Sequence, residues 1–322
     1  MPKRIHPKPI SLAEIFIKFS TDDQCLEYIE KMRWPDGVVR CPQCGNDKIS
    51  KVERKTNSKN RRKWFYLCLE KTCHNQFSPT SGTLFADSHL PLLIWFHAIG
   101  LMLNAKKGIS AKQLQRDLGI GGYKTAWYLN HRIREAMGNG EIPKLGGTVE
   151  IDETYVGGKI SGKGISYAKK QKQVVMGAIQ RGGELRLEHV TGATVGNFRE
   201  FIQKHVSEDA DRVVTDQHPA YPAALGTLVD RHETVNHIIH EYVRGDVTTN
   251  AIESVFSLFK RGVIGQYHKL SAKHLQRYLT EFEYRFNRRN DGDVFIETVR
   301  RLCGFKPLRF AELTSDPETV PF

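Results

Sequence analysis

The stretch TVEIDETYVGG (residues 148–158) alternates apolar and polar side chains as a β-strand does, and a glycine pair ends it. Its middle carries three acids, Glu150, Asp152 and Glu153. The chain of 322 residues has a formal net charge of +12, so an ordinary exposed strand would more easily be neutral or basic. Either these acids face water, or one of them holds a cation.

The residues after this stretch repeat the strand signal. Apolar or alternating runs of strand length recur at 173–179, 185–190, 212–216 and 233–238, with a helical pattern at 197–206. Two longer helical patterns follow, at 249–262 and 271–289. Three strands, a helix and two further strands predict an α/β layer. The tail after Phe305 is predicted to be irregular.

The composition indicates a globular protein, with 39% hydrophobic residues to build cores for two or three compact units. The longest apolar run, 90–103, is shorter than the roughly 20 residues that a membrane span needs, and it contains His97. The basic N-terminus lacks the apolar core of a secretory signal. We therefore expect no membrane partner, a cytoplasmic location and reduced thiols, and the positive charge favours a polyanionic partner.

Two close cysteine pairs lie in a polar segment. Their members are Cys41, Cys44, Cys68 and Cys73. Such pairs supply the four thiolates of a tetrahedral structural zinc site, and so polar a segment has little core without a metal. The second pair is spaced by four residues where a zinc ribbon usually has two, and His74 beside it is an alternative ligand. Cys25 and Cys303 are predicted to be buried small side chains.

Residues 108–137 have the pattern of a helix-turn-helix, with Ser110 as N-cap and a glycine-containing turn at 118–122. The second helix is expected to turn its polar residues outward, toward phosphates or base edges: Lys124, Tyr128, Asn130, Arg132 and Arg134. A plain helical hairpin is the alternative. The Gly/Pro-containing segment 138–147 is the predicted domain boundary.

Two further acids follow predicted elements. Asp216 ends the strand at 212–216, and Glu253 lies on the helix at 249–262. Taken singly, Asp216 could cap a turn, and Asn250 with Glu253 resembles a capping box. Together with Asp152, these acids form a set that can hold two Mg²⁺ ions, because hard cations take oxygen ligands.

Several motifs together resemble the bacterial insertion-sequence transposases of the ISXO-like group, over about residues 10 to 305. The motifs are RWPDG…CPQCG, FSPTSGTLF, EIDETYVGG, VTDQHPAY, NAIESVFSLFKRGVIGQYH and HLQRYLTEFEYRFNRR. The resemblance implies a zinc ribbon, a helix-turn-helix and an RNase H-like DDE core. It also implies cleavage of double-stranded DNA at the inverted-repeat ends of an element, and transfer of the 3′ ends to target DNA with Mg²⁺ or Mn²⁺. A homodimer or higher oligomer on DNA, near the bacterial nucleoid, is expected.

By this resemblance Asp152 is the first catalytic acid and Asp216 the second, while the third is Glu253 or Asn250. Glu253 is favoured because it is anionic and because Lys260 follows it by two helical turns on the same face. Lys260 and Arg261 are expected to contact DNA phosphate. Glu150 and Glu153 are expected to be neighbours of the site or solvated.

The expected domains are an N-terminal helix and zinc ribbon at 1–86, a helix-turn-helix region at 87–140, an RNase H-like catalytic domain at 141–305 and an irregular tail at 306–322. The Gly/Lys-rich segment 156–172 is either a DNA-contacting hairpin or a surface loop. Two other functions compete with transposition. One is a zinc-ribbon regulator with a catalytically silent domain, and the other is a structure-selective nuclease.

Overall fold

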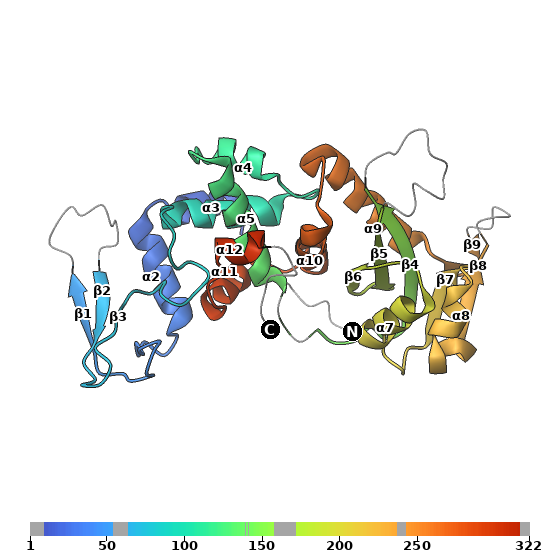
Figure 1. Cartoon of the computed structure of the whole chain (residues 1–322), viewed down its shortest axis with the longest axis horizontal. Coiled ribbons are helices and arrows are strands. Elements are labelled where there is room, and N and C mark those ends of the chain that lie inside the picture. Colours follow the sequence, from blue (N-terminus) through green and yellow to red (C-terminus); the bar gives the residue numbers. More distant parts are fainter. Residues whose placement is uncertain are drawn as a thin grey trace. The chain divides into compact units, whose positions relative to one another are not determined.

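A computed structural model describes residues 10–53, 64–138, 140, 142–157, 172–236 and 243–315. The chain divides into two compact units (Figure 1). The first comprises Met1–Met137 together with Asn290–Phe322, and the second comprises Gly138–Arg289. Within the described residues, every helix is too short or too polar to cross a membrane.

The first unit begins with α1 (Leu12–Lys18) and α2 (Asp22–Arg33), followed by an antiparallel sheet of order β1-β2-β3. Its strands are β1 (Ile49–Glu53), β2 (Trp64–Cys68) and β3 (Gln76–Phe77). Three helices follow, α3 (Leu92–Asn104), α4 (Ala111–Asp117) and α5 (Tyr123–Gly138). Ser110 caps α4 as predicted, because its side chain accepts a hydrogen bond from the Gln113 N–H.

The C-terminal segment returns to this first unit, so the predicted catalytic domain of 141–305 extends too far. Helix α11 (Val294–Gly304) packs here, with the Phe295 ring 5.9 Å from that of Phe96. The Leu84 N–H donates to the Leu302 carbonyl at 3.0 Å. Helix α12 (Phe310–Thr314) also lies in the tail that was predicted to be irregular. An apolar helix face shows that a partner is needed, but it does not say which one.

The second unit contains a five-stranded sheet of order β6-β5-β4-β7-β8. The strands are β4 (Thr148–Val156), β5 (Gln173–Gln180), β6 (Leu185–Val190), β7 (Arg212–Asp216) and β8 (His232–Val235). The β4–β5 and β5–β6 pairs are antiparallel, whereas the β4–β7 and β7–β8 pairs are parallel. A short ribbon of β9 (Val243–Arg244) and β10 (Val247–Thr248) precedes the last helices. The predicted α/β layer is confirmed.

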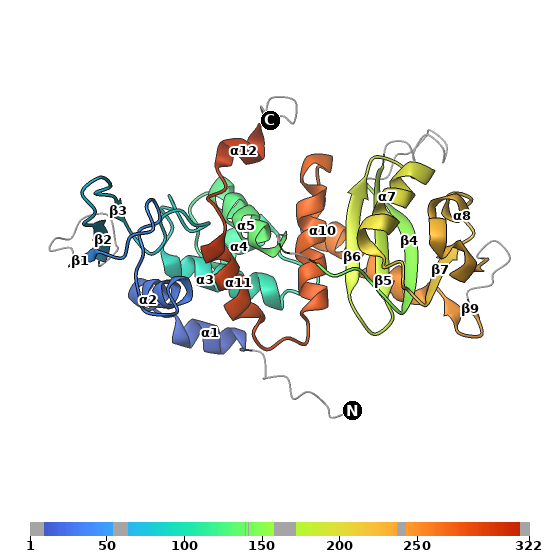
Figure 2. The same cartoon turned by 90° about the horizontal axis from the view of Figure 1, so that it is seen from below.

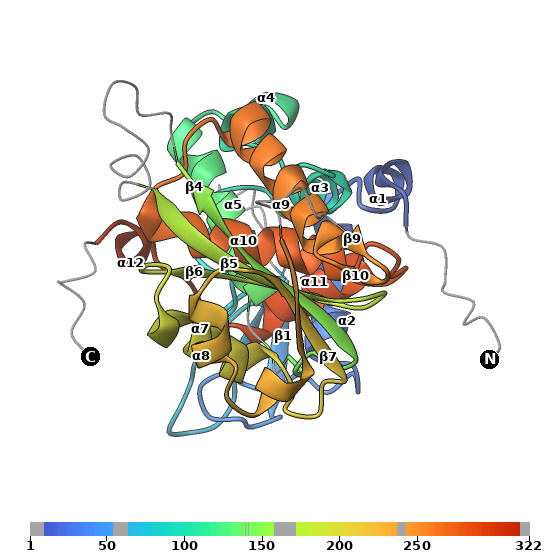
Figure 3. The ribbon, with the colours of Figure 1, turned by 90° about the vertical axis from the view of Figure 1, so that its right-hand side faces the viewer.

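Helices cover both faces of this sheet (Figure 3). On one face lie α7 (Val195–His205) and α8 (Ala220–Ala224), and the position of α7 over the strands is visible in Figure 2. The other face carries α9 (Asn250–Gly262) and α10 (Ala272–Asn287). Val149 and Ile151 pack toward α7, as the alternation of β4 predicts. The intervening Glu150 therefore points to the α9 face.

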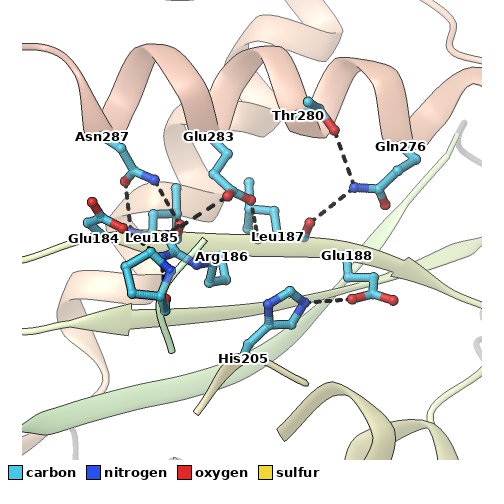
Figure 4. Close-up of polar contacts among 11 residues, drawn as sticks. Glu184, Leu185, Arg186, Leu187, Glu188, His205, Gln276, Thr280, Glu283 and Asn287 are labelled. Atoms are coloured by element: carbon cyan, nitrogen blue, oxygen red, sulfur yellow. Dashed lines mark hydrogen bonds and ion pairs between the residues drawn. The ribbon is translucent and has the colours of Figure 1, made fainter. Parts of the chain in front are cut away.

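Helix α10 closes the exposed edge of β6 (Figure 4). Three of its side chains accept hydrogen bonds from alternate N–H groups of that strand, each at 2.8 Å: Asn287 from Leu185, Glu283 from Leu187 and Gln276 from His189. An open sheet edge invites pairing with another chain, and these side chains occupy its donors instead.

This edge gives the second unit a testable pH dependence. Burial raises the pKa of Glu283 from its ordinary value of 4.5 to about 7, although Arg186 lies 3.9 Å away. Between these two pH values the folded chain binds more protons than the unfolded chain, so the contribution of Glu283 to stability falls as pH rises.

Glu283→Gln keeps an acceptor for the Leu187 N–H and removes the titration. In urea unfolding, the unfolding free energy of the mutant relative to that of the wild type should rise by about 2 kcal/mol from pH 5 to pH 8. An equal difference in unfolding free energy at the two pH values would contradict the assignment.

Candidate functional site

The four cysteines of the ribbon converge in the first unit. Their sulfur atoms all lie within 4.8 Å of one another, at Cys41, Cys44, Cys68 and Cys73. The Sγ–Sγ distance is 3.7 Å between Cys41 and Cys73 and 3.6 Å between Cys44 and Cys68. Ligand bonds of about 2.3 Å in a tetrahedral zinc site place sulfurs about 3.8 Å apart. The sulfurs therefore fit a structural zinc ion, with His74 outside the cluster.

The local backbone prepares Cys41 to ligate a metal. Burial opposes ionisation of this thiol, but the N–H groups of Cys44 and Gln43 hydrogen-bond to it and lower its pKa to about 6. A thiolate is the form that binds zinc. The wider spacing between Cys68 and Cys73 is accommodated by a turn in which the Cys73 N–H donates to the Glu70 carbonyl at 3.0 Å.

Purified protein should carry about one zinc per chain, and Cys41→Ser should lose it together with order in the ribbon. Among the described residues of the ribbon, the core that could stabilise it without a metal is small and consists mainly of Trp34, Trp64, Tyr66 and Phe77. Elemental analysis with near-UV circular dichroism measures both effects. Cys303→Ser, outside the cluster, is the matched control and should keep its zinc. A folded chain prepared without chelators and free of zinc would contradict the site.

The α4–α5 region exposes fewer basic residues than the sequence predicts. Lys124 is exposed, but Arg132 is only 2% exposed, so its predicted outward position is wrong. Its guanidinium donates to the Ala86 carbonyl and lies 4.8 Å from the Trp95 ring centroid. Asn130 and Arg134 are buried as well. The half-buried Tyr128 donates its hydroxyl hydrogen to the Leu308 carbonyl. Segments distant in the sequence thus cover this helix.

In the second unit, strand pairing brings two acids together. Strand β7 runs parallel to β4 with Glu150 opposite Val214. That register, continued by two residues, puts Asp216, the last residue of β7, beside Asp152 in the middle of β4. One carboxylate oxygen from each of Asp152, Glu153 and Asp216 lies within 4.8 Å of the others.

Glu153 is a member of this cluster, whereas the sequence analysis expected it to be a neighbour of the site or solvated. Alternation on β4 sends its side chain to the α8 face, where the buried Tyr221 donates its hydroxyl hydrogen to Glu153 Oε2 at 3.0 Å. One of its carboxylate oxygens nevertheless lies within 4.8 Å of those of Asp152 and Asp216. The signal in the sequence was its place directly after Asp152, together with Tyr221 in the motif VTDQHPAY.

The cluster concentrates negative charge in a poorly solvated place. Burial, together with the charges of Glu153, Asp216 and Glu253, raises the pKa of Asp152 to about 8. Burial also lowers the pKa of Lys260, while the charge of Asp152 opposes that shift. Glu253 and Lys260, both on α9, therefore interact electrostatically with Asp152. Clustered carboxylates of this kind fit a hard divalent cation.

The start of α9 differs from the predicted capping box. Its N-cap is Thr249, whose hydroxyl donates to Glu253 Oε1 at 2.9 Å. Asn250 is the first helical residue and is exposed. Arg261 is exposed near the other end of the helix. Most of the predicted hairpin at 156–172 lies outside the described residues.

Comparison with known proteins agrees with this arrangement. Residues 144–287 match the ISXO2-like transposase domain, and residues 20–76 match the transposase zinc-ribbon domain. The chain is also 28% identical over 282 residues to an uncharacterised protein in transposable element ISH50 of Halobacterium salinarum. That match covers 83% of this chain and 91% of the relative. The chain therefore carries an ISXO2-like transposase domain, preceded by a transposase zinc-ribbon domain.

Proposed function

We propose that the chain is a DNA transposase that cleaves at the inverted-repeat ends of an insertion sequence and transfers the 3′ ends to target DNA. The observation that carries this proposal is the meeting of Asp152 and Asp216 on adjacent parallel strands, within the electrostatic reach of α9. The sheet order, with helices on both faces, supports an RNase H-like core.

The carboxylates would hold Mg²⁺ or Mn²⁺. When bound, two such ions supply an activated water or hydroxyl group and neutralise charge on the attacking and leaving oxygens. Asp152 and Asp216 would hold these ions from the sheet, and Glu253 would hold them from α9, since the charges of Asp216 and Glu253 both act on the Asp152 carboxyl group. The exposed Asn250 remains the alternative to Glu253.

Basic side chains near the cluster would orient the DNA. Lys260 is half-buried and feels the charge of Asp152, which suits a contact to the phosphate next to the scissile bond. Arg261 is exposed one residue further on. In the first unit, the ribbon and the α4–α5 region would bind the duplex of the element end, with Lys124 at the exposed start of α5. Two ends must be processed together, so a homodimer or higher oligomer on DNA is expected.

Asp152→Asn and Asp216→Asn should each abolish cleavage while binding of end DNA persists, because each variant keeps its side-chain shape and loses a ligand charge. Glu253→Gln should lower the cleavage rate at least about 100-fold. Asn250→Ala should keep most activity, because Asn250 is exposed and is not the N-cap residue of α9. Gel assays with labelled element ends in Mn²⁺ measure both the binding and the cleavage of end DNA.

Ca²⁺ should permit binding without cleavage in the same assay, because it takes oxygen ligands with looser geometry. An active Glu253→Gln with an inactive Asn250→Ala would move the third ligand to Asn250. Cleavage that persists in EDTA would contradict the proposed chemistry as a whole. Cleavage of branched DNA without inverted repeats would instead indicate a structure-selective nuclease.

Lys124→Ala should weaken binding of end DNA and reduce the slope of log K against log salt concentration by about one, because one phosphate contact is lost. Fluorescence anisotropy at several salt concentrations measures this slope. Lys204→Ala is the control, because Lys204 already pairs with Glu188 at 3.0 Å. An unchanged slope in Lys124→Ala would remove α5 from the DNA interface.

A further inference from the structure

Glu150 is a buried acid outside the carboxylate cluster. Its side chain is 2% exposed, and it points to the α9 face two residues before Asp152 on β4. Glu150 Oε2 accepts hydrogen bonds from the N–H groups of Ala251 at 2.9 Å and Ile252 at 3.3 Å. These N–H groups belong to the first turn of α9, where no intrahelical acceptor exists. Glu150 therefore caps α9 from a neighbouring strand, and its charge suits the positive end of the helix.

Arg181 contacts both Glu150 and the start of α9, and these two side chains together anchor the helix. It follows β5, and its Nε donates to Glu150 Oε1 at 2.9 Å. Its Nη2 donates to the Thr248 carbonyl at 3.1 Å, just before the N-cap of α9. One guanidinium thus neutralises the buried carboxylate and also holds the chain that enters the helix. A buried carboxylate without such a partner would be costly.

Packing brings the same helix close to the sheet beside Asp152. Gly177 on β5 pairs directly with Asp152. A Cβ atom at Gly177 would lie 2.7 Å from Ile252 Cδ1 and 2.8 Å from Phe256 Cζ, closer than such contacts allow. Helix α9 therefore occupies the space that any larger residue would fill. Its height above the sheet depends on this glycine, while the anchor at Glu150 sets where the helix begins.

We propose that Glu150 and Arg181 form a positioning pair that fixes the first turn of α9 against β4 and so holds Glu253 beside Asp152. The inference rests on the proposed function and adds residues that do not touch the reacting atoms. Glu253 lies one residue after Ile252, so a shift of the anchored turn moves Glu253 directly. Misplacement of a catalytic group by about 1 Å can cost 100-fold in rate.

Glu150→Gln in the full-length chain tests the pair. Hydrogen exchange should become faster at Ala251 and Ile252, because their acceptor loses its charge. The dissociation constant for Mn²⁺, measured from the free-ion signal in electron paramagnetic resonance, should rise about 10- to 100-fold, as for other residues that orient metal ligands. The rate constant for end cleavage should fall by a similar factor, whereas the KM for end DNA and the zinc content stay unchanged.

Glu283→Gln is the matched control. Glu283 is also a buried carboxylate that accepts a backbone N–H and faces an arginine, but it anchors α10 on β6. Its Mn²⁺ affinity and cleavage rate should equal those of the wild type. Gly177→Ala is a second, independent perturbation, because it displaces α9 by packing and leaves Glu150 intact. It should weaken Mn²⁺ binding in the same direction even if Glu150→Gln folds poorly.

Wild-type Mn²⁺ affinity and cleavage rate in both Glu150→Gln and Gly177→Ala would overturn the positioning role while the proposed function stands. An equal loss in Glu283→Gln would also overturn it, because general loosening would then explain the effect. A wild-type chain that neither binds Mn²⁺ nor cleaves element ends would contradict the proposed function itself, and the inference with it.

Discussion

The parallel pairing of β4 with β7 is the constraint on which the second unit depends. It brings Asp152 and Asp216, far apart in the sequence, close together in the sheet. A shift of one residue in this register would turn Asp216 to the opposite face and separate the two carboxylates. The buried apolar residues of both strands hold the register, since Val149, Ile151 and Val213 lie in one core cluster. The two strands that contribute to the buried core therefore also carry the two clustered acids.

Each unit places groups close together that repel one another when they are ionised. The ribbon brings four sulfurs together, and the sheet brings half-buried carboxylates together at a place where the pKa of Asp152 rises to about 8. The rest of each unit has to offset that repulsion. In the second unit the offset includes the close packing of Ile252 and Phe256 on Gly177 and the neutral pair of Glu150 with Arg181. Helix α9 thus connects the structural and the chemical parts of the unit.

The sequence predicted those features that depend on local pattern. The strands around Asp152 and Asp216, the α/β layer and the paired cysteines follow from periodicity and spacing. It failed where distant segments decide the outcome. Arg132 is polar, yet Ala86 and Trp95 surround it, and no local pattern shows such a covering. Likewise, the apolar face of α11 did not reveal that its partners lie in the first unit. The roles of Glu150 and Glu153 depend on Ala251 and Tyr221, which come close only in the folded chain.

The central claim is that Asp152 and Asp216 share a divalent cation at the end of the sheet, with α9 beside it. The most direct test is a crystal structure of the full-length protein grown with Mn²⁺, with data collected at a wavelength where manganese scatters anomalously. The account predicts an anomalous peak within coordination distance of one carboxylate oxygen from each of Asp152 and Asp216. Ordered carboxylates with no anomalous peak between them at saturating Mn²⁺, or a peak held by other residues, would contradict it.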